Sequence, residues 1–286
     1  MRVTLDIFSG RPNPSWELSS WQVRELRARV ADNALKSARV THPSLGFRGL
    51  IVTSQSDDFA GLRLPAAFRV GAPDLEPTAD REAPPAQKGE THASTLWLLQ
   101  TAVGSLDPNL LAFASGEMRK FSPTKVQASR MSALQGTVAV PPGVRSSPYN
   151  PDYWDELSVQ PYNNCYNFAT NFRSDTTAQP GRISGAQYSE ISCWNVGTAA
   201  SWDGVGTTVQ AVSNLVALVI WPGVDFHWYR MQAEGFWAHK IGHGPATNME
   251  SGGNVIQGEL TPANCGRGPY TSFCGYRYSP VGVHVT

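Results

Sequence analysis

The amino-acid sequence predicts a mixed α+β protein, and three patterns support this prediction. Apolar and polar residues alternate over residues 3–7, which is typical of a half-buried strand. From Ser19 or Ser20 to Val30, apolar residues recur at near-helical spacing among arginines and glutamates, which indicates an amphipathic helix. The unbroken apolar run Leu215–Trp221 has the length of a buried strand and is much shorter than the roughly 20 residues of a membrane span.

The composition is that of a folded protein with no strong net charge. Of the 286 residues, 41% are hydrophobic and 16% are charged, and 23 Lys and Arg balance 23 Asp and Glu. A disordered chain is therefore excluded. Neither nucleic acid nor a membrane span is expected, because no positive field attracts phosphates and no apolar stretch is long enough. The composition does not define an oligomeric state.

The cellular location is not decided by the sequence. No apolar block follows Arg2, so a conventional secretory signal is not predicted. The content of glycine (26), proline (21) and tryptophan (9) is nevertheless typical of exported proteins. An extracellular and a cytoplasmic location both stay open.

The first half of the chain predicts an α+β module. After the strand at residues 3–7, the run Ser9–Pro14 forbids regular structure and is expected to be a hairpin turn, with a ligand-binding finger as the rarer alternative. The remaining predicted elements are strands at residues 47–53 and 61–70, a long loop at 71–89 and a helix at 94–103.

A segment rich in structure breakers separates the two halves. It contains Pro141, Pro142, Gly143, Pro148 and Pro151, and we place the domain boundary near residue 145. Residues 1–145 then form an N-terminal module of unknown role, and residues 146–286 form a second module.

The second module opens with a cysteine at a helix start. Cys165, Phe168, Ala169 and Phe172 fall on one helical face, and Asn163 or Asn164 is a suitable N-cap. Backbone N–H groups and the helix dipole favour negative charge there, which predicts a lowered thiol pKa. Such a cysteine suits a nucleophile.

Two histidines lie on predicted strands further along. Leu215–Trp221, Phe226–Gln232 and Phe236–Lys240 are expected to be consecutive antiparallel strands, with His227 on the second and His239 on the third. A two-residue turn would place the histidines on opposite faces of the sheet. A three-residue loop with Gly235 in the left-handed conformation pairs Tyr229 with His239 and places both histidines on one face, and glycine at that position favours this register.

These features resemble the papain-like cysteine hydrolases, in particular the NlpC cell-wall endopeptidases and the CHAP amidases. The resemblance covers residues 163–240 and includes the twelve-residue spacing of the two histidines across a glycine-bearing hairpin. It implies that Cys165 is the nucleophile, His227 the general base and His239 the residue that orients the base. The implied reaction is thiolate attack on an amide or ester carbonyl of a peptide or cell-wall-like substrate, completed by hydrolysis or acyl transfer without a cofactor.

Further site residues are expected around this centre. Tyr166, Gln179, Arg182 and Trp228 are the candidate substrate contacts. Among the four cysteines, Cys265 and Cys274 are the expected disulfide, because the glycine- and proline-containing segment between them can fold back.

Several alternatives stay open. Cys165 and Cys193 could be bonded, which would make the protein a disulfide-stapled, non-catalytic binding or structural protein with an aromatic-rich surface. The histidines could be packed among tryptophans with their nitrogens hydrogen-bonded internally. A zinc site at His239 and His243 is not expected, because glycine and proline interrupt the helix that would align them.

Overall fold

The structure is a computed structural model that describes residues 1–32, 35, 44–54, 65–71, 88–120, 144, 146–209 and 212–286. It confirms the mixed α+β class. The chain divides into two compact units. The first contains Met1–Ile7, Asn13–His42 and Phe47–Val126, and the second contains Phe8–Pro12, Pro43–Gly46 and Gln127–Thr286. The boundary near residue 145 stays a prediction, because residues 121–143 and 145 lie outside the described part.

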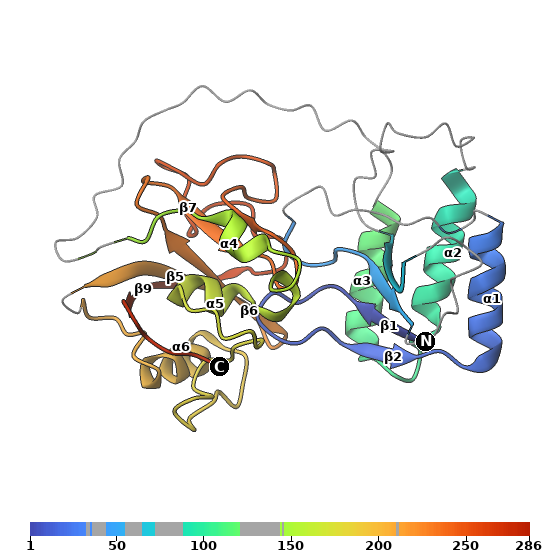
Figure 1. The fold of residues 1–286 in the computed structure, drawn as a ribbon, viewed down its shortest axis with the longest axis horizontal. Coiled ribbons are helices and arrows are strands. Elements are labelled where there is room, and N and C mark those ends of the chain that lie inside the picture. The colour runs from blue at the N-terminus through green and yellow to red at the C-terminus, as the bar shows by residue number, and fades with distance from the viewer. Residues whose placement is uncertain are drawn as a thin grey trace. The chain divides into compact units, whose positions relative to one another are not determined.

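In its described residues, the first unit is a four-stranded antiparallel sheet with helices beside it (Figure 1). The strand order is β2-β1-β3-β4. The elements are β1 (Arg2–Leu5), β2 (Ser15–Glu17), α1 (Ser20–Ala31), β3 (Leu50–Thr53), β4 (Ala67–Val70), α2 (Lys88–Gln100) and α3 (Pro108–Lys120).

Local signals explain the elements of the first unit. Ser19 caps α1, and Gln22 completes a capping box with it, as expected from the serine at this position. Helix α2 starts six residues before the predicted Ser94 and ends before Val103. Helix α3 was not predicted as a helix, although Asp107 accepts hydrogen bonds from the next turn and is a recognisable cap. The predicted loop at residues 71–89 lies mostly outside the described residues.

The second unit contains a five-stranded antiparallel sheet in the order β8-β7-β6-β5-β9. Its helices are α4 (Pro151–Asp155), the short 3₁₀ helix η2 (Gln160–Tyr162), α5 (Cys165–Thr170) and α6 (Cys193–Trp202). Its strands are β5 (Ser213–Trp221), β6 (Asp225–Met231), β7 (Trp237–Lys240), β8 (Ala246–Thr247) and β9 (Ser272–Pro280). In the described residues, no helix is long and apolar enough to cross a membrane.

The hairpin of β6 and β7 has the three-residue loop that the glycine favours. Tyr229 pairs with His239, the N–H of Gln232 donates to the carbonyl of Phe236, and Gly235 has a φ of +89°. A left-handed glycine closes this loop without a clash. The register prediction is therefore confirmed, and both histidines lie on one face of the sheet.

Candidate functional site

Cys165 is the first residue of α5, as predicted. Asn164 caps the helix by accepting hydrogen bonds from the N–H groups of Tyr166 and Asn167, and the Asn167 side chain accepts one from the Asn164 N–H in return. These bonds satisfy the free donors of a six-residue helix. Cys165 itself is completely buried.

The environment of the Cys165 thiol opposes ionisation. Burial raises its pKa well above the ordinary value of 9.0, and the nearby Asp225 carboxyl raises it further. The thiol lies 3.9 Å from the carbonyl oxygen of Phe226. The expectation of a lowered pKa is therefore wrong. A helix terminus stabilises a charge by about 1 kcal/mol or less, whereas desolvating an ion costs several times more.

The two histidines form a buried pair. Nε2 of His227 lies 2.8 Å from Nδ1 of His239, and Nε2 of His239 lies 2.8 Å from the carbonyl oxygen of Met249. Burial lowers the pKa of His239 to about 4, so its ring is neutral at pH 7. The His227 ring also packs edge-on against Tyr229 and Tyr270. These two hydrogen bonds use three of the four ring nitrogens of the pair, which is typical of histidines packed inside a protein.

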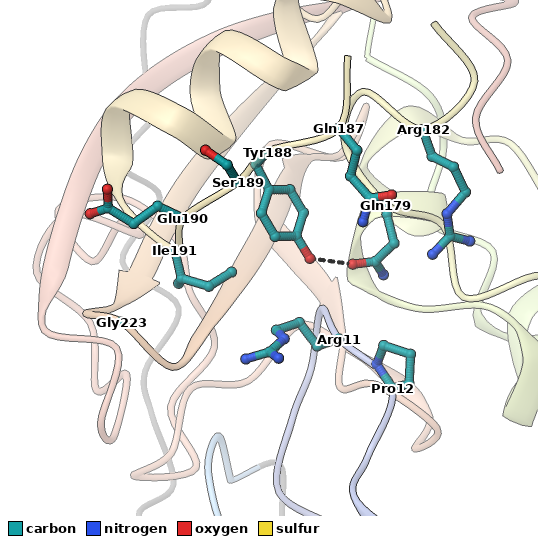
Figure 2. Close-up of a pocket in the computed structure, with 10 residues that line it drawn as sticks. All are labelled: Arg11, Pro12, Gln179, Arg182, Gln187, Tyr188, Ser189, Glu190, Ile191 and Gly223. Carbon is teal, nitrogen blue, oxygen red and sulfur yellow. Dashed lines mark hydrogen bonds between the residues drawn. The ribbon is translucent and has the colours of Figure 1, made fainter. Parts of the chain in front are cut away.

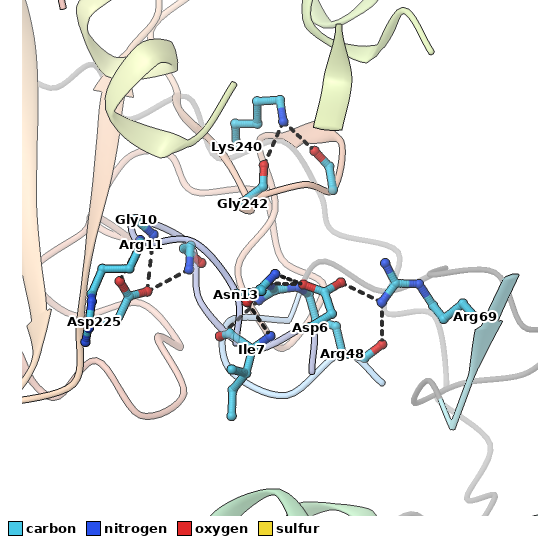
Figure 3. Close-up of polar contacts among 12 residues, drawn as sticks. Asp6, Ile7, Gly10, Arg11, Asn13, Arg48, Arg69, Asp225, Lys240 and Gly242 are labelled. Carbon is cyan, nitrogen blue, oxygen red and sulfur yellow. Dashed lines mark hydrogen bonds and ion pairs between the residues drawn. The ribbon is translucent and has the colours of Figure 1, made fainter. Parts of the chain in front are cut away.

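A loop from the start of the chain is held at the same place. The carboxylate of Asp225 accepts hydrogen bonds from the N–H groups of Ser9, Gly10 and Arg11 at 2.6, 3.2 and 3.0 Å, and from the Tyr270 hydroxyl at 2.6 Å. Figure 3 shows Asp225 beside Gly10 and Arg11. Burial raises the pKa of Asp225, and the hydrogen bonds from Tyr270, Ser9 and Gly10 act in the opposite direction. The loop connects the antiparallel strands β1 and β2, as expected of a hairpin turn, and it is docked against buried groups.

Helix α5 contacts this loop directly. The Ser9 carbonyl accepts from the Cys165 N–H at 3.5 Å, and the Gly10 carbonyl accepts from Asn164 Nδ2 at 2.6 Å. Sequence reasoning missed the role of Asp225. Its signal was the position of an acidic residue directly before the apolar strand that carries His227.

Lys240 is a second polar residue that sequence reasoning missed. It is buried, and its three ammonium N–H donors are shared among the carbonyl oxygens of Gln160, Asn163, Gly242 and Gly244, which lie 2.6, 2.6, 2.7 and 2.9 Å from Nζ. Carbonyl groups compensate the desolvated charge and tie the segment before α5 to the loop after β7.

The four predicted substrate contacts have different surroundings. Tyr166 and Trp228 are both fully buried and belong to the core that also contains Cys165, so neither presents a surface to a substrate. The Tyr166 hydroxyl donates to Asp203 at 3.1 Å. Gln179 is 1% exposed, and Arg182 is exposed, and both line a pocket described below.

The disulfide differs from the predicted one. Cys193 is bonded to Cys274, 81 residues away, and Cys165 and Cys265 are free thiols. The predicted Cys265–Cys274 bond is wrong, and the alternative Cys165–Cys193 bond is not formed either. The reason is strand pairing: β9 lies beside β5 and contacts α6, so Cys274 meets the first residue of that helix.

The described residues contain no group of three or more His, Cys, Asp or Glu side chains that could hold a metal ion.

Comparison with known proteins gives a different picture from the resemblance to hydrolases. No family model and no solved structure matches the chain. One curated relative, Insoluble matrix shell protein 1 from Ruditapes philippinarum, is 41% identical over 137 residues, which are 46% of this chain and 90% of the relative.

This relative overturns the expectation of a thiol-dependent hydrolase or acyltransferase acting on peptide or cell-wall-like amides. Its name is that of a matrix protein and not of a peptidase or amidase, and burial and a raised pKa make the Cys165 thiol a poor candidate for the predicted nucleophile. At 41% identity over 90% of the relative, the chain belongs to the family of Insoluble matrix shell protein 1.

Proposed function

We propose that this protein is a disulfide-stapled, non-catalytic structural component of an insoluble matrix. The observation that carries the proposal is the state of Cys165: the thiol is fully buried and its pKa is raised, in a chain whose family is named for a shell matrix. A protonated thiol is a poor nucleophile. The histidine pair likewise serves the internal hydrogen bonding of the second unit.

The second unit is held together in a way that suits a structural role. The Cys193–Cys274 bond closes a long loop between α6 and β9, and such a bond removes conformational freedom from the unfolded chain. Asp225 and Lys240 add buried, multiply hydrogen-bonded charges at two further places. These contacts stabilise the fold and leave its surface available for partners.

The surface of α6 supports association with other molecules. Trp194 and Trp202 are 79% and 68% exposed. Large apolar side chains with this exposure contribute contact area in protein association. They are the aromatic surface that the proposed structural role uses.

We also propose that the second unit has a papain-like arrangement that serves as a scaffold. The support is a helix that begins at a cysteine and packs on an antiparallel sheet, with two histidines on neighbouring strands. An experimental structure of the unit tests this assignment, because a different order of strands around α5 would contradict it.

Two measurements on the purified full chain test the function. Alkylation with iodoacetamide at pH 7, mapped by mass spectrometry, is expected to leave Cys165 unmodified while the protein is folded. Sedimentation at rising protein concentration is expected to show a growing insoluble fraction, which decreases in a Trp194→Ser/Trp202→Ser variant. A protein that stays soluble and monomeric at all concentrations, or a Cys165 that alkylates rapidly, contradicts the proposal.

A further inference from the structure

A pocket on the second unit has no role in the proposed scaffold. Its volume is about 590 Å³. The residues that line it come from the docked loop, the segment before α6 and the turn after β5; Figure 2 shows them, among them Arg11, Gln179, Arg182, Tyr188, Glu190 and Ile191.

Two guanidinium groups, those of Arg11 and Arg182, line this pocket. Nη1 of Arg11 donates to the Val224 carbonyl at 2.6 Å, and Nη1 of Arg182 donates to the Thr177 carbonyl at 3.3 Å. Among the described residues, neither arginine forms an ion pair. Each guanidinium therefore keeps further N–H donors for a ligand, in the planar arrangement that matches a carboxylate.

Tyr188 and Gln179 form a hydrogen-bonded pair in this pocket, with Arg11 below the pair and Arg182 beyond Gln179 in Figure 2. Burial raises the pKa of Tyr188 to about 12; the charge of Arg11 acts to lower it, the carboxyl group of Asp225 acts to raise it, and the charge of Arg182 has a smaller lowering effect. Both arginines line the same pocket as this hydroxyl group. Both positive charges would attract an anionic ligand bound at this hydroxyl group.

The pocket is built in advance of any ligand. Gln179 is buried, its Nε2 donates to the Gly10 carbonyl at 2.8 Å, and its Oε1 accepts from the Tyr188 hydroxyl at 2.5 Å. The Arg11 N–H is bound to Asp225. Arg11 and Tyr188 are therefore tied to the same docked loop, so little order has to be created when a ligand binds.

We propose that this pocket binds a carboxylate side chain of an acidic protein segment. The inference rests on the proposed function, because it names the partner class of a structural protein. Two guanidiniums select an anion. Pro12 and Ile191 add apolar surface for the methylene groups of a glutamate or aspartate. Glu190 lies at the rim with its carboxylate turned away from the Tyr188–Gln179 pair, and it disfavours a densely charged polyanion (Figure 2).

An acidic protein segment also fits better than an acidic polysaccharide. Tyr188 is the one aromatic residue of the lining, and it is half-buried with its ring edge-on to Phe226 at 5.6 Å. The exposed tryptophans of α6 do not line the pocket. The pocket therefore lacks a broad exposed aromatic face on which a sugar ring could stack.

Titration calorimetry on the full chain tests the inference. The probe is an acetylated, amidated pentapeptide Ala-Glu-Ala-Glu-Ala, and its matched control carries Gln at both Glu positions. We expect weak, salt-sensitive binding of the Glu peptide and about tenfold weaker binding of the Gln peptide, since a hydrogen bond to a charged group contributes roughly 1.5 kcal/mol or more. The Arg182→Gln substitution should weaken binding of the Glu peptide by a similar factor. Arg24→Gln, an exposed arginine on α1, is the control and should change nothing.

Two results overturn the inference: equal binding of both peptides, or a uronate oligosaccharide or inorganic phosphate that binds as tightly as the Glu peptide. The sedimentation assay is run on the same samples. If the peptide binds but no insoluble fraction forms, the structural role is contradicted and the proposed pocket is not. If an insoluble fraction forms but the peptide does not bind, the proposed pocket is contradicted and the structural role is not.

Discussion

His227 donates a hydrogen bond to His239, and His239 donates one to the backbone carbonyl group of Met249. The Met249 carbonyl can only accept, so Nε2 of His239 carries the proton and Nδ1 of that ring accepts from Nε2 of His227. The chain of two bonds requires a neutral His239, and the lowered pKa of about 4 agrees with this state. Protonation at Nδ1 would place two donors against each other in a buried site.

Stability is expected to fall when the pH is lowered from 7 to 4. The pKa of His239 is about 4 in the folded protein and 6.5 in the unfolded chain. Between these pH values the unfolded chain binds more protons than the folded protein, so lowering the pH favours the unfolded state. The cost at pH 4 is up to about 3 kcal/mol. Urea unfolding across this range measures it. A His239→Gln variant is the control, and an equally steep pH dependence in that variant contradicts the assignment.

Asp225→Asn should release the loop that contains Ser9 and Gly10. The amide group lacks the charge that four hydrogen-bond donors share, so we expect a loss of about 3 kcal/mol in unfolding free energy. Hydrogen exchange at the Ser9 and Gly10 amides should accelerate. Asp152→Asn, on an exposed side chain of α4, should leave both quantities unchanged. Unaltered exchange at Ser9 in the Asp225→Asn variant would show that the carboxylate does not hold the loop.

Gly10→Ala should destabilise the second unit by steric overlap. A Cβ at this position would lie 2.4 Å from the Phe226 ring and 2.5 Å from the Phe226 carbonyl oxygen. Because backbone must move, we expect a cost of about 1–3 kcal/mol in thermal or urea unfolding. At Gly206, a Cβ meets nothing closer than 4.0 Å, so Gly206→Ala is the matched control. Equal stability of the two variants would contradict the tight docking of Gly10.

The Cys193→Ser/Cys274→Ser variant should lose about 4 kcal/mol in unfolding free energy. The bond closes a loop across a separation of 81 residues, and the entropy that it removes from the unfolded chain grows with the logarithm of that length. Cys265→Ser, which removes a free thiol, should cost much less. Thiol titration gives an independent check: two free thiols should appear on denaturation without a reductant. Four thiols would exclude the bond.

Much of the local structure followed from short-range signals. The caps were predictable to within one residue, Ser19 or Ser20 for α1 and Asn163 or Asn164 for α5, because cap bonds join residues three positions apart; the structure selects Ser19 and Asn164. The register of the β6–β7 hairpin was recognisable because Gly235 favours one loop length. In both cases the partners are near neighbours in the chain.

The disulfide and the thiol pKa were not predictable in the same way. Cys274 bonds to Cys193 because β9 pairs with β5 and reaches α6, and this pairing is not encoded near either cysteine. The pKa of Cys165 depends on how completely the core and the docked loop exclude water. The prediction from the helix start considered only the helix dipole, whose lowering effect on the thiol pKa is smaller than the raising effect of desolvation.

The sequence by itself determined the α+β class, the cap that starts α5 and the hairpin that places His227 and His239 on one face. Only the tertiary structure decided that Asp225 holds a loop more than 200 positions earlier in the chain and that the Cys165 thiol is buried. The physical reason is how far apart in the chain the interacting residues lie. Caps and tight turns depend on atoms a few residues apart, whereas desolvation and long-range hydrogen bonds depend on every segment that packs around a group.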